Sequence, residues 1–163
     1  LTIMRKLSDK LWITGSGKRL QFDKIEATVS KHHKKKKKIF IGSDSFIRNK
    51  KICFVTAICL LNKGLNRYFY YRESVSLSQY RNLPTRITEE VRRSIEIAEH
   101  FVTNYKIPAK TFELHLDVSP SAAKNETSRF SEMLKGYVQG YGLSCKLKPN
   151  AWASQSVADR HSK

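Results

Sequence analysis

The fold of this chain is decided around residues 39–45, where the sequence reads Ile-Phe-Ile-Gly-Ser-Asp-Ser. Three consecutive apolar residues predict a short buried strand, and the small residues after them predict a turn. Asp44 stands where that strand is expected to end. This carboxylate has two interpretations: it opens the turn, as Asp-Ser pairs often do, or it holds a divalent cation.

A second segment carries an acid in a similar place. Residues 112–118 read Phe-Glu-Leu-His-Leu-Asp-Val and alternate between apolar and polar, which predicts a half-buried strand with Asp117 near its end. Two strands that each carry an acid at the same end bring both carboxylates together. His115 alternates with Asp117 and so shares its face, but a buried histidine is more often structural, and we leave it outside the predicted site.

Charge indicates the class of partner. The chain has 163 residues, enough for one domain with a real core, and its 31 Lys and Arg against 14 acids give a net charge of +17. This excess predicts a polyanionic partner, with nucleic acid, and RNA in particular, favoured over anionic lipid. Five consecutive lysines are expected to form a solvated loop that contacts phosphates without sequence preference: Lys34, Lys35, Lys36, Lys37 and Lys38.

The cysteines and the hydropathy pattern bear on the compartment. Three cysteines without metal-ligand spacing predict reduced core residues of an intracellular protein. No apolar run approaches the roughly 20 residues of a membrane span, so no membrane association is expected. The cytoplasm is favoured and an organelle also fits, since the sequence starts at Leu1 and leaves open a transit peptide upstream.

The order of predicted elements defines a fold class. A short helix capped by Asp23 is expected within a basic N-terminal extension, residues 1–38, ahead of a domain at 39–163. Strands are expected at 39–41, 52–61, 68–75, 111–118 and 143–148, and helices at 85–105, 126–139 and 152–161. The resulting order, β-β-β-α-β-α-β-α, predicts an α/β fold with a five-stranded mixed sheet and helices on its faces.

This order of elements and acids resembles the ribonuclease H-like superfamily, and in particular its poorly characterised YkuK-type branch. The resemblance covers about residues 12–163. It rests on Ile-Gly-Ser-Asp-Ser at 41–45, Glu-Val at 90–91, His-Leu-Asp-Val-Ser-Pro at 115–120, and the tail KLKPNAWASQSVAD at 146–159. Ser43 and Ser119 stand where the branch commonly has Thr and Asn, two small polar changes that leave the acids in place.

The resemblance implies an acidic cluster that binds two Mg²⁺ or Mn²⁺ ions and hydrolyses phosphodiester bonds. The implied ligands and catalytic residues are Asp44, Glu90, Asp117 and Asp159. The helical spacing of 85–105 separates the neighbouring acids: Glu89 should face solvent with Arg93, while Glu90 lies on the border of the apolar stripe. Near the expected strand ends, four further residues are candidates for phosphate contacts: Lys124, Asn125, Lys146 and Lys148.

Two functions therefore follow from the sequence. The first is a two-metal nuclease acting on RNA, an RNA–DNA hybrid or branched nucleic acid. The second is a non-catalytic basic protein that binds structured RNA, for instance in a ribosome or another ribonucleoprotein. Four retained acids favour the enzyme, because clustered negative charge weakens binding to phosphates unless cations lie between them.

Overall fold

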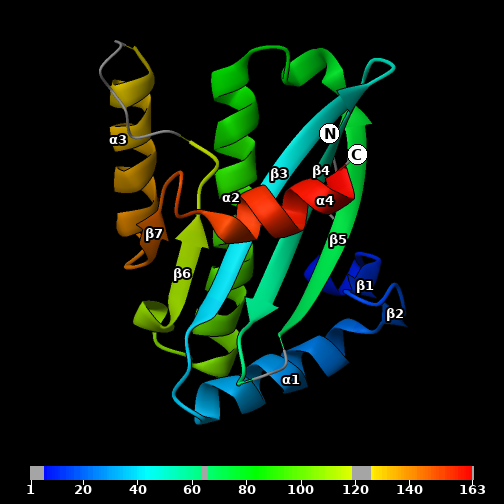
Figure 1. The fold of residues 1–163 in the computed structure, drawn as a ribbon, viewed down its shortest axis with the longest axis vertical. Helices are drawn as coiled ribbons and strands as arrows, with labels where there is room; N and C mark the ends of the chain where they lie inside the picture. Colours follow the sequence, from blue (N-terminus) through cyan, green and yellow to red (C-terminus); the bar gives the residue numbers. More distant parts are fainter. Residues whose placement is uncertain (1–5, 64–65, 119–125, 163) are drawn as a thin grey trace.

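The structure is a computed structural model that describes residues 6–63, 66–118 and 126–162, without the side chains of 126–129 (Figure 1). Its strands are β1 (Trp12–Thr14), β2 (Arg19–Leu20), β3 (Ile39–Arg48), β4 (Lys51–Leu60), β5 (Arg67–Ser76), β6 (Phe112–His115) and β7 (Ser144–Lys146). Its helices are α1 (Phe22–Lys34), α2 (Leu83–Tyr105), α3 (Glu126–Gln139) and α4 (Asp159–Ser162). Short 3₁₀ turns lie at Leu7–Asp9 (η1), Leu77–Gln79 (η2) and Ala109–Thr111 (η3), and the π-helical segment η4 spans Ala153–Ala158.

The strands form one mixed sheet in the order β2-β1-β5-β4-β3-β6-β7. Antiparallel pairing joins β3, β4 and β5 into the expected meander, while β6 runs parallel to β3 and β7 parallel to β6. The predicted α/β class with a mixed sheet is confirmed, but five strands were too few. The N-terminal extension supplies β1 and β2, and β1 adds to the free edge of β5. Trp12 fixes that addition, because its buried ring packs on Phe22 and Tyr71.

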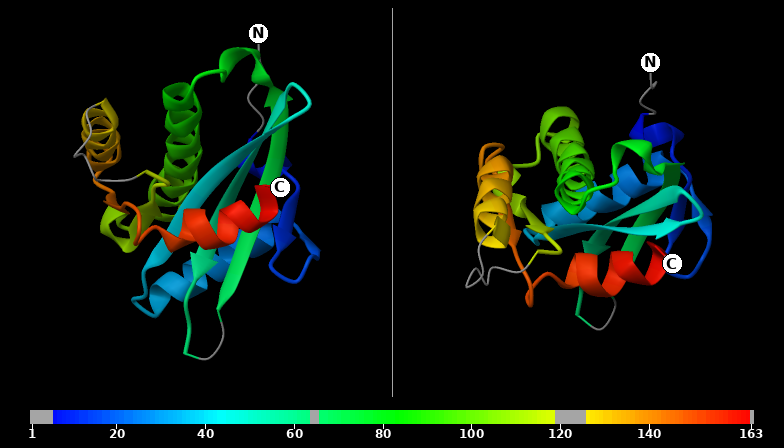
Figure 2. Two further views of the ribbon diagram at one scale, coloured as in Figure 1. Left: turned by 45° about the horizontal axis from the view of Figure 1, so that its top comes forward. Right: turned by 90° about the horizontal axis from the view of Figure 1, so that it is seen from above.

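Side chains alternate between two cores on opposite faces of the sheet. Ile39 and Ile41 of β3 pack in the larger core, to which α1, α2 and α3 contribute. Phe40, between them, packs in a smaller core together with Ala153 and Ala158 of η4. Seen from above, α1 and α2 lie on one face of the sheet and η4 with α4 on the other (Figure 2). Residues of β3 therefore point alternately toward α2 and toward the C-terminal segment.

Three predictions about where elements begin or end were wrong, and the first concerns the site. β3 does not stop before Gly42 but runs to Arg48, so Asp44 lies inside a strand, opposite Val55 of β4. α1 begins at Phe22, with Gln21 as its N-cap residue and no side-chain cap hydrogen bond, so Asp23 is not its cap. α1 also continues to Lys34, which makes the start of the lysine run helical rather than a loop.

The predicted bounds of the helices after β5 agree more closely with the structure. α3 has the predicted bounds, and α2 begins two residues earlier than predicted because Asn82 caps it by accepting from the Thr85 amide. The last predicted helix is divided into η4 and α4. Cys53, Cys59 and Cys145 are free thiols, as expected. Within the described ranges no helix combines the length and apolarity that crossing a membrane requires.

Candidate active site at the fork between β3 and β6

The site lies where two parallel strands part. β3 and β6 pair from Ile39↔Phe112 to Gly42↔His115, where β6 ends while β3 continues. We call this point the fork. Asp44 and Asp117 each stand two residues beyond the last pair, so parallel register places them at the same level. The predicted convergence of the two acids thus depends on pairing register rather than on both strands ending there.

Asp44 points toward the C-terminal segment. Its side chain is buried, and Oδ2 lies 3.1 Å from the Ser162 hydroxyl of α4. Burial raises the pKa of Asp44 from 3.8 to about 7, reinforced by a hydrogen bond with the Asp159 carboxyl and by the negative charge of Asp117. Protonation of Asp44 below this pKa removes the charge repulsion with the neighbouring Asp159 carboxyl.

Glu90 approaches from the opposite face. Ser43 and Ser45 flank Asp44 and point toward α2, where Ser43 contacts Ser94 at 2.8 Å and Ser45 donates to Glu90 Oε2 at 2.5 Å. Burial raises the pKa of Glu90 from 4.5 to about 8, with added contributions from the charges of Asp44 and Asp117. Glu90 therefore reaches the fork from the α2 face and Asp44 from the α4 face.

Glu89, its neighbour, belongs to an ion-pair network away from the fork. It accepts from Arg92 Nε at 2.6 Å and from Arg93 Nε at 2.8 Å, in a network that also includes Glu73. The predicted separation of Glu89 from Glu90 is present, but the solvent face assigned to Glu89 and Arg93 was wrong. Arg93 is buried, and its guanidinium lies over the Phe54 ring at 4.5 Å.

Asp117 and Asp159 are less enclosed than Asp44 and Glu90. Asp117 Oδ1 pairs with Lys148 Nζ at 2.8 Å, so this predicted phosphate contact is directed at an acid of the site. Lys146 is exposed on β7. Lys124 and Asn125 lie outside the described residues. Asp44, Glu90, Asp117 and Asp159, which we call the acidic cluster, thus come from β3, α2, the segment after β6 and α4.

The C-terminal segment is held at the fork by contacts that sequence reasoning missed. A Cβ on Gly42 would lie 2.4 Å from backbone atoms of Ala153 and Ser154, so only glycine permits η4 to pack this closely on β3. His115 Nδ1 accepts from the Ala153 amide at 3.0 Å, and its Nε2 donates to Glu113 at 2.9 Å. Burial lowers the pKa of His115, which suits this neutral, structural role. The one feature of the sequence that could have indicated this close packing is Gly42, two residues before Asp44.

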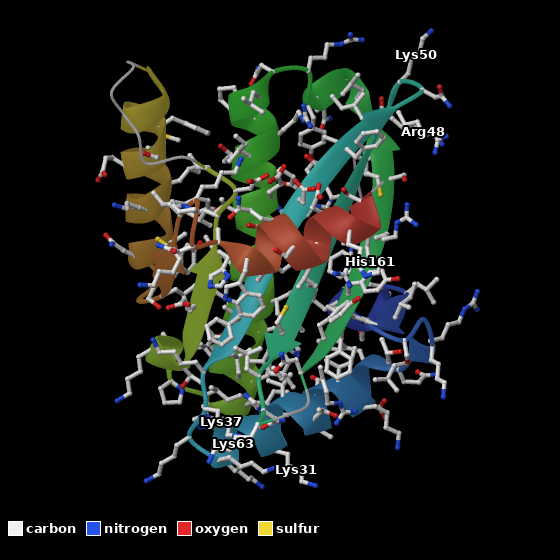
Figure 3. The ribbon with its side chains drawn as sticks, viewed as in Figure 1. Lys31, Lys37, Arg48, Lys50, Lys63 and His161 are labelled. Atoms are coloured by element: carbon white, nitrogen blue, oxygen red, sulfur yellow. The ribbon has the colours of Figure 1, made fainter. Side chains whose placement is uncertain are left out.

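An aromatic contact anchors the far end of the same segment. His161 of α4 stacks on Tyr70 with ring centroids 3.9 Å apart, and its Nε2 lies 2.8 Å from the Tyr68 hydroxyl (Figure 3). Both tyrosines belong to β5, so α4 crosses the sheet and carries Asp159 back to Asp44. The position of Asp159 therefore depends on contacts with strands more than 80 residues earlier in the chain.

The donor chemistry suits a hard divalent cation. All four side chains offer carboxylate oxygens, which Mg²⁺ and Mn²⁺ prefer. Ion pairs within the described ranges include neither Asp44 nor Glu90. In the arrangement seen here, no three His, Cys, Asp or Glu side chains of residues 6–63, 66–118 and 126–162 gather closely enough to hold a metal. The ligand types fit a divalent cation, whereas in this arrangement Asp44 and Glu90 have raised pKa values and Asp117 pairs with Lys148.

The lysine segment, Lys34–Lys38, immediately precedes β3, whereas Asp44 lies past the middle of the strand. Lys37, Lys31 and Lys63 are at the lower end of the view in Figure 3, and Arg48, the last residue of β3, is at the upper end. Asp44 stands between these two ends along the strand. Six residues of extended chain separate Lys38 from Asp44, about 20 Å. Lys37 donates to Asn62 Oδ1 at 2.7 Å, and Lys38 lies 3.7 Å from Glu113. The fold thus keeps the lysine segment away from the acidic cluster.

Comparison with known proteins agrees with this architecture. A model of the family described as "Ribonuclease H-like" matches residues 21–163. The chain is also 25% identical over 154 residues to a Bacillus subtilis (strain 168) protein named "Uncharacterized protein YkuK", with 86% of this chain and 88% of the relative covered. The family match spans the meander, the fork and all four acids, and on this evidence the chain belongs to the ribonuclease H-like family.

Proposed function

We propose that this protein is a divalent-metal-dependent nuclease that hydrolyses phosphodiester bonds in RNA, an RNA–DNA hybrid or branched nucleic acid. The observation that carries the proposal is a pair of buried carboxylates, Asp44 and Glu90, that reach one fork from opposite faces of the sheet. Burying two acids in one place is unfavourable for folding, and a pair with strongly raised pKa values favours a functional role over a structural one.

The acidic cluster would hold the metal. Two Mg²⁺ or Mn²⁺ ions, if held there, would supply an activated water and would neutralise charge on the leaving oxygen. Asp44 and Glu90 would bind a cation in their deprotonated form, and Asp117 would bind one in place of the Lys148 ammonium. Lys148 is then free to move toward a phosphate, which reconciles its ion pair with its predicted role. Ser45 and Ser162 orient Glu90 and Asp44 through their hydroxyls.

The second candidate is a non-catalytic RNA-binding protein, within a ribosome or another ribonucleoprotein. It is favoured by the exposed lysine segment, which offers charge far from the fork, and by the net charge of +17. Such a protein needs phosphate contacts but has no use for buried acids. The two candidates therefore differ in what the acidic cluster does.

A metal-dependent cleavage assay separates them. Wild type should cleave an RNA, hybrid or junction substrate with Mn²⁺ or Mg²⁺, and Asp117→Asn should abolish cleavage, by about 10³-fold or more, while the melting temperature changes little. Asn keeps the shape of the side chain but loses the charge that binds a cation. Asp9→Asn makes the same chemical change at an exposed residue of η1 and should be silent. If wild type binds these substrates but cleaves none of them, the binding protein replaces the nuclease.

A further inference from the structure

Arg86 lies on α2 one turn before Glu90, at the same fork, and its guanidinium is incompletely bonded. Nη2 approaches the Ser45 hydroxyl at 3.5 Å. Nε is buried and has no hydrogen-bond partner. Among the described residues no carboxylate forms an ion pair with Arg86. Glu90 lies one turn away on the same helix and Asp44 adjoins Ser45, so an arginine without a direct acidic partner is unexpected here.

The other two arginines of α2 each form ion pairs with two carboxylates, as expected for a structural role. Arg92 pairs with Glu89 and Glu96, and Arg93 pairs with Glu89 and Glu73. Arg86, in contrast, is separated from Glu90 by Ser45, whose hydroxyl donates to Glu90 and faces the Arg86 guanidinium. If Arg86 served only to neutralise Glu90, a direct bond would stabilise both groups more.

A buried N–H without a partner is costly, so such a group is expected to acquire one when a ligand binds. Guanidinium groups offer five donors in a planar fork that matches the oxygens of a phosphate. An anion that approaches the acidic cluster from outside would supply the partner that Arg86 lacks. At a site where nucleic acid is processed, that anion is a backbone phosphate.

We propose that Arg86 binds a phosphate of the nucleic-acid backbone beside the acidic cluster, and so positions the strand over the fork. This inference rests on the proposed function for the identity of the ligand, but it concerns binding and does not require cleavage. Arg86 would then be a phosphate-binding residue, opposite in charge to the four acids that it adjoins. Its contact fixes where along the strand the acidic cluster meets the backbone.

The test compares two arginine substitutions that remove the same charge. Arg86→Ala should weaken binding of an RNA–DNA hybrid, measured by fluorescence anisotropy without divalent metal, about tenfold. It should also reduce the slope of log K against log salt by about 0.7–0.9, the value for one phosphate. Arg19→Ala alters an exposed residue of β2, at the far edge of the sheet, and should change binding less than about twofold.

Mn²⁺ binding provides a second test, because Arg86→Ala should not weaken it although it weakens binding of the hybrid. Removing a cation from beside Glu90 should leave Mn²⁺ affinity, measured by calorimetry, unchanged or tighter, whereas general damage to the fork would weaken it. Arg86→Lys retains the charge but not the planar fork, and should fold even if Arg86→Ala does not. It should bind the hybrid several-fold more weakly than wild type.

Equal hybrid binding by Arg86→Ala and Arg19→Ala would overturn the inference, as would a parallel loss of Mn²⁺ affinity in Arg86→Ala. Hybrid binding by Arg86→Lys as tight as that of wild type, should the alanine variant not fold, would overturn it too. Failure of the nuclease proposal looks different: wild type would then not cleave, while the difference in binding between the two arginine variants would persist.

Discussion

The start and the middle of β3 adjoin opposite charges in opposite environments. Near Ile39, the lysine segment presents exposed or half-exposed ammonium groups at high density. Further along the strand, Asp44 and Glu90 bring carboxylates into the protein interior. Exposed lysines are well solvated, so they are tolerated in many arrangements and specify little geometry. Buried carboxylates are tolerated only where protons, hydroxyls or cations compensate them, so their positions are specified by the fold. We therefore expect large effects at the fork and small ones at the lysine segment.

The largest effect should separate Glu90 from Glu89. Glu90→Gln should reduce metal binding and cleavage by about 10³-fold, because the amide is a poor cation ligand. The same substitution resembles the protonated acid, so at pH 8 and above the metal-free protein should be at least as stable as wild type. Titration calorimetry with Mn²⁺ and urea unfolding provide the two measurements.

Glu89→Gln is the matched control, with the reverse outcome. Activity should be nearly unchanged, since Glu89 faces Arg92 and Arg93. Stability should fall by about 1–3 kcal/mol, because buried Arg93 loses one of its two carboxylate partners. Loss of Mn²⁺ binding in Glu89→Gln with retention in Glu90→Gln would show that the helix is wrongly placed at the fork.

The next effect concerns the close packing of η4 on β3. Gly42→Ala places a methyl group against the backbone of Ala153 and Ser154, so the C-terminal segment must shift and move Asp159 away from Asp44. We expect a loss of stability of about 1–3 kcal/mol and a larger proportional loss of activity.

Gly136→Ala is the control for Gly42→Ala, because it makes the same glycine-to-alanine substitution away from η4. Gly136 lies in α3 with no atom near its absent Cβ, so this substitution should stabilise the protein by about 0.5–1 kcal/mol through helix propensity. Thermal unfolding of both variants should show a lower melting temperature for Gly42→Ala and a higher one for Gly136→Ala. If Gly42→Ala were as stable and as active as wild type, close packing of η4 on β3 would not be what positions Asp159.

The pH dependence of stability should report the proton that burial retains on Glu90. The folded protein binds protons at Asp44 and Glu90 more tightly than the unfolded chain does, with pKa values of about 7 and about 8 against 3.8 and 4.5. This contribution to stability is complete below the unfolded pKa values and is lost as pH rises through the folded ones.

Between pH 5 and 8 we expect wild type to lose about 1–3 kcal/mol relative to Glu90→Gln. Urea unfolding without metal measures this, and saturating Mn²⁺ at pH 8 should restore the loss. A flat difference across this range would contradict retention of a proton at Glu90.

The smallest effect per residue should be at the lysine segment. Replacing Lys34–Lys38 by serine should weaken binding to all sequences similarly and lower the salt slope by about 0.7–0.9 for each phosphate that a lysine no longer neutralises. The rate of cleavage at saturating substrate should not change, because the segment lies about 20 Å from Asp44. A variant limited to Lys34, Lys35 and Lys36 keeps the contacts of Lys37 and Lys38 with Asn62 and Glu113 and controls for stability. An unchanged slope in both variants would place the nucleic acid elsewhere.

Some elements were predictable because their signal is local. α3 and α2 follow from helical periodicity with capping residues, and they match within two residues. β3 was predicted too short because Gly-Ser-Asp-Ser resembles a turn. In the fold, each polar residue of that stretch has a separate partner: Ser43 contacts Ser94, Asp44 contacts Ser162, and Ser45 contacts Glu90. β1 and β2 were missed because strands of three and two residues are stable only through pairing, here of β1 with β5 and of β2 with β1.

The sequence by itself determined the charge excess, the alternation of the central strands, and the identity of the four acids with Glu90 separated from Glu89. These properties reside in residue types and short spacings. Only the tertiary structure decided that Asp44 and Glu90 are buried, that Lys148 pairs with Asp117, that Arg86 is left with an unbonded N–H, and that the lysine segment lies away from the acidic cluster. Burial and pairing depend on partners between 31 and 118 residues away, such as Lys148 for Asp117 and Ser162 for Asp44, and no local pattern encodes those contacts.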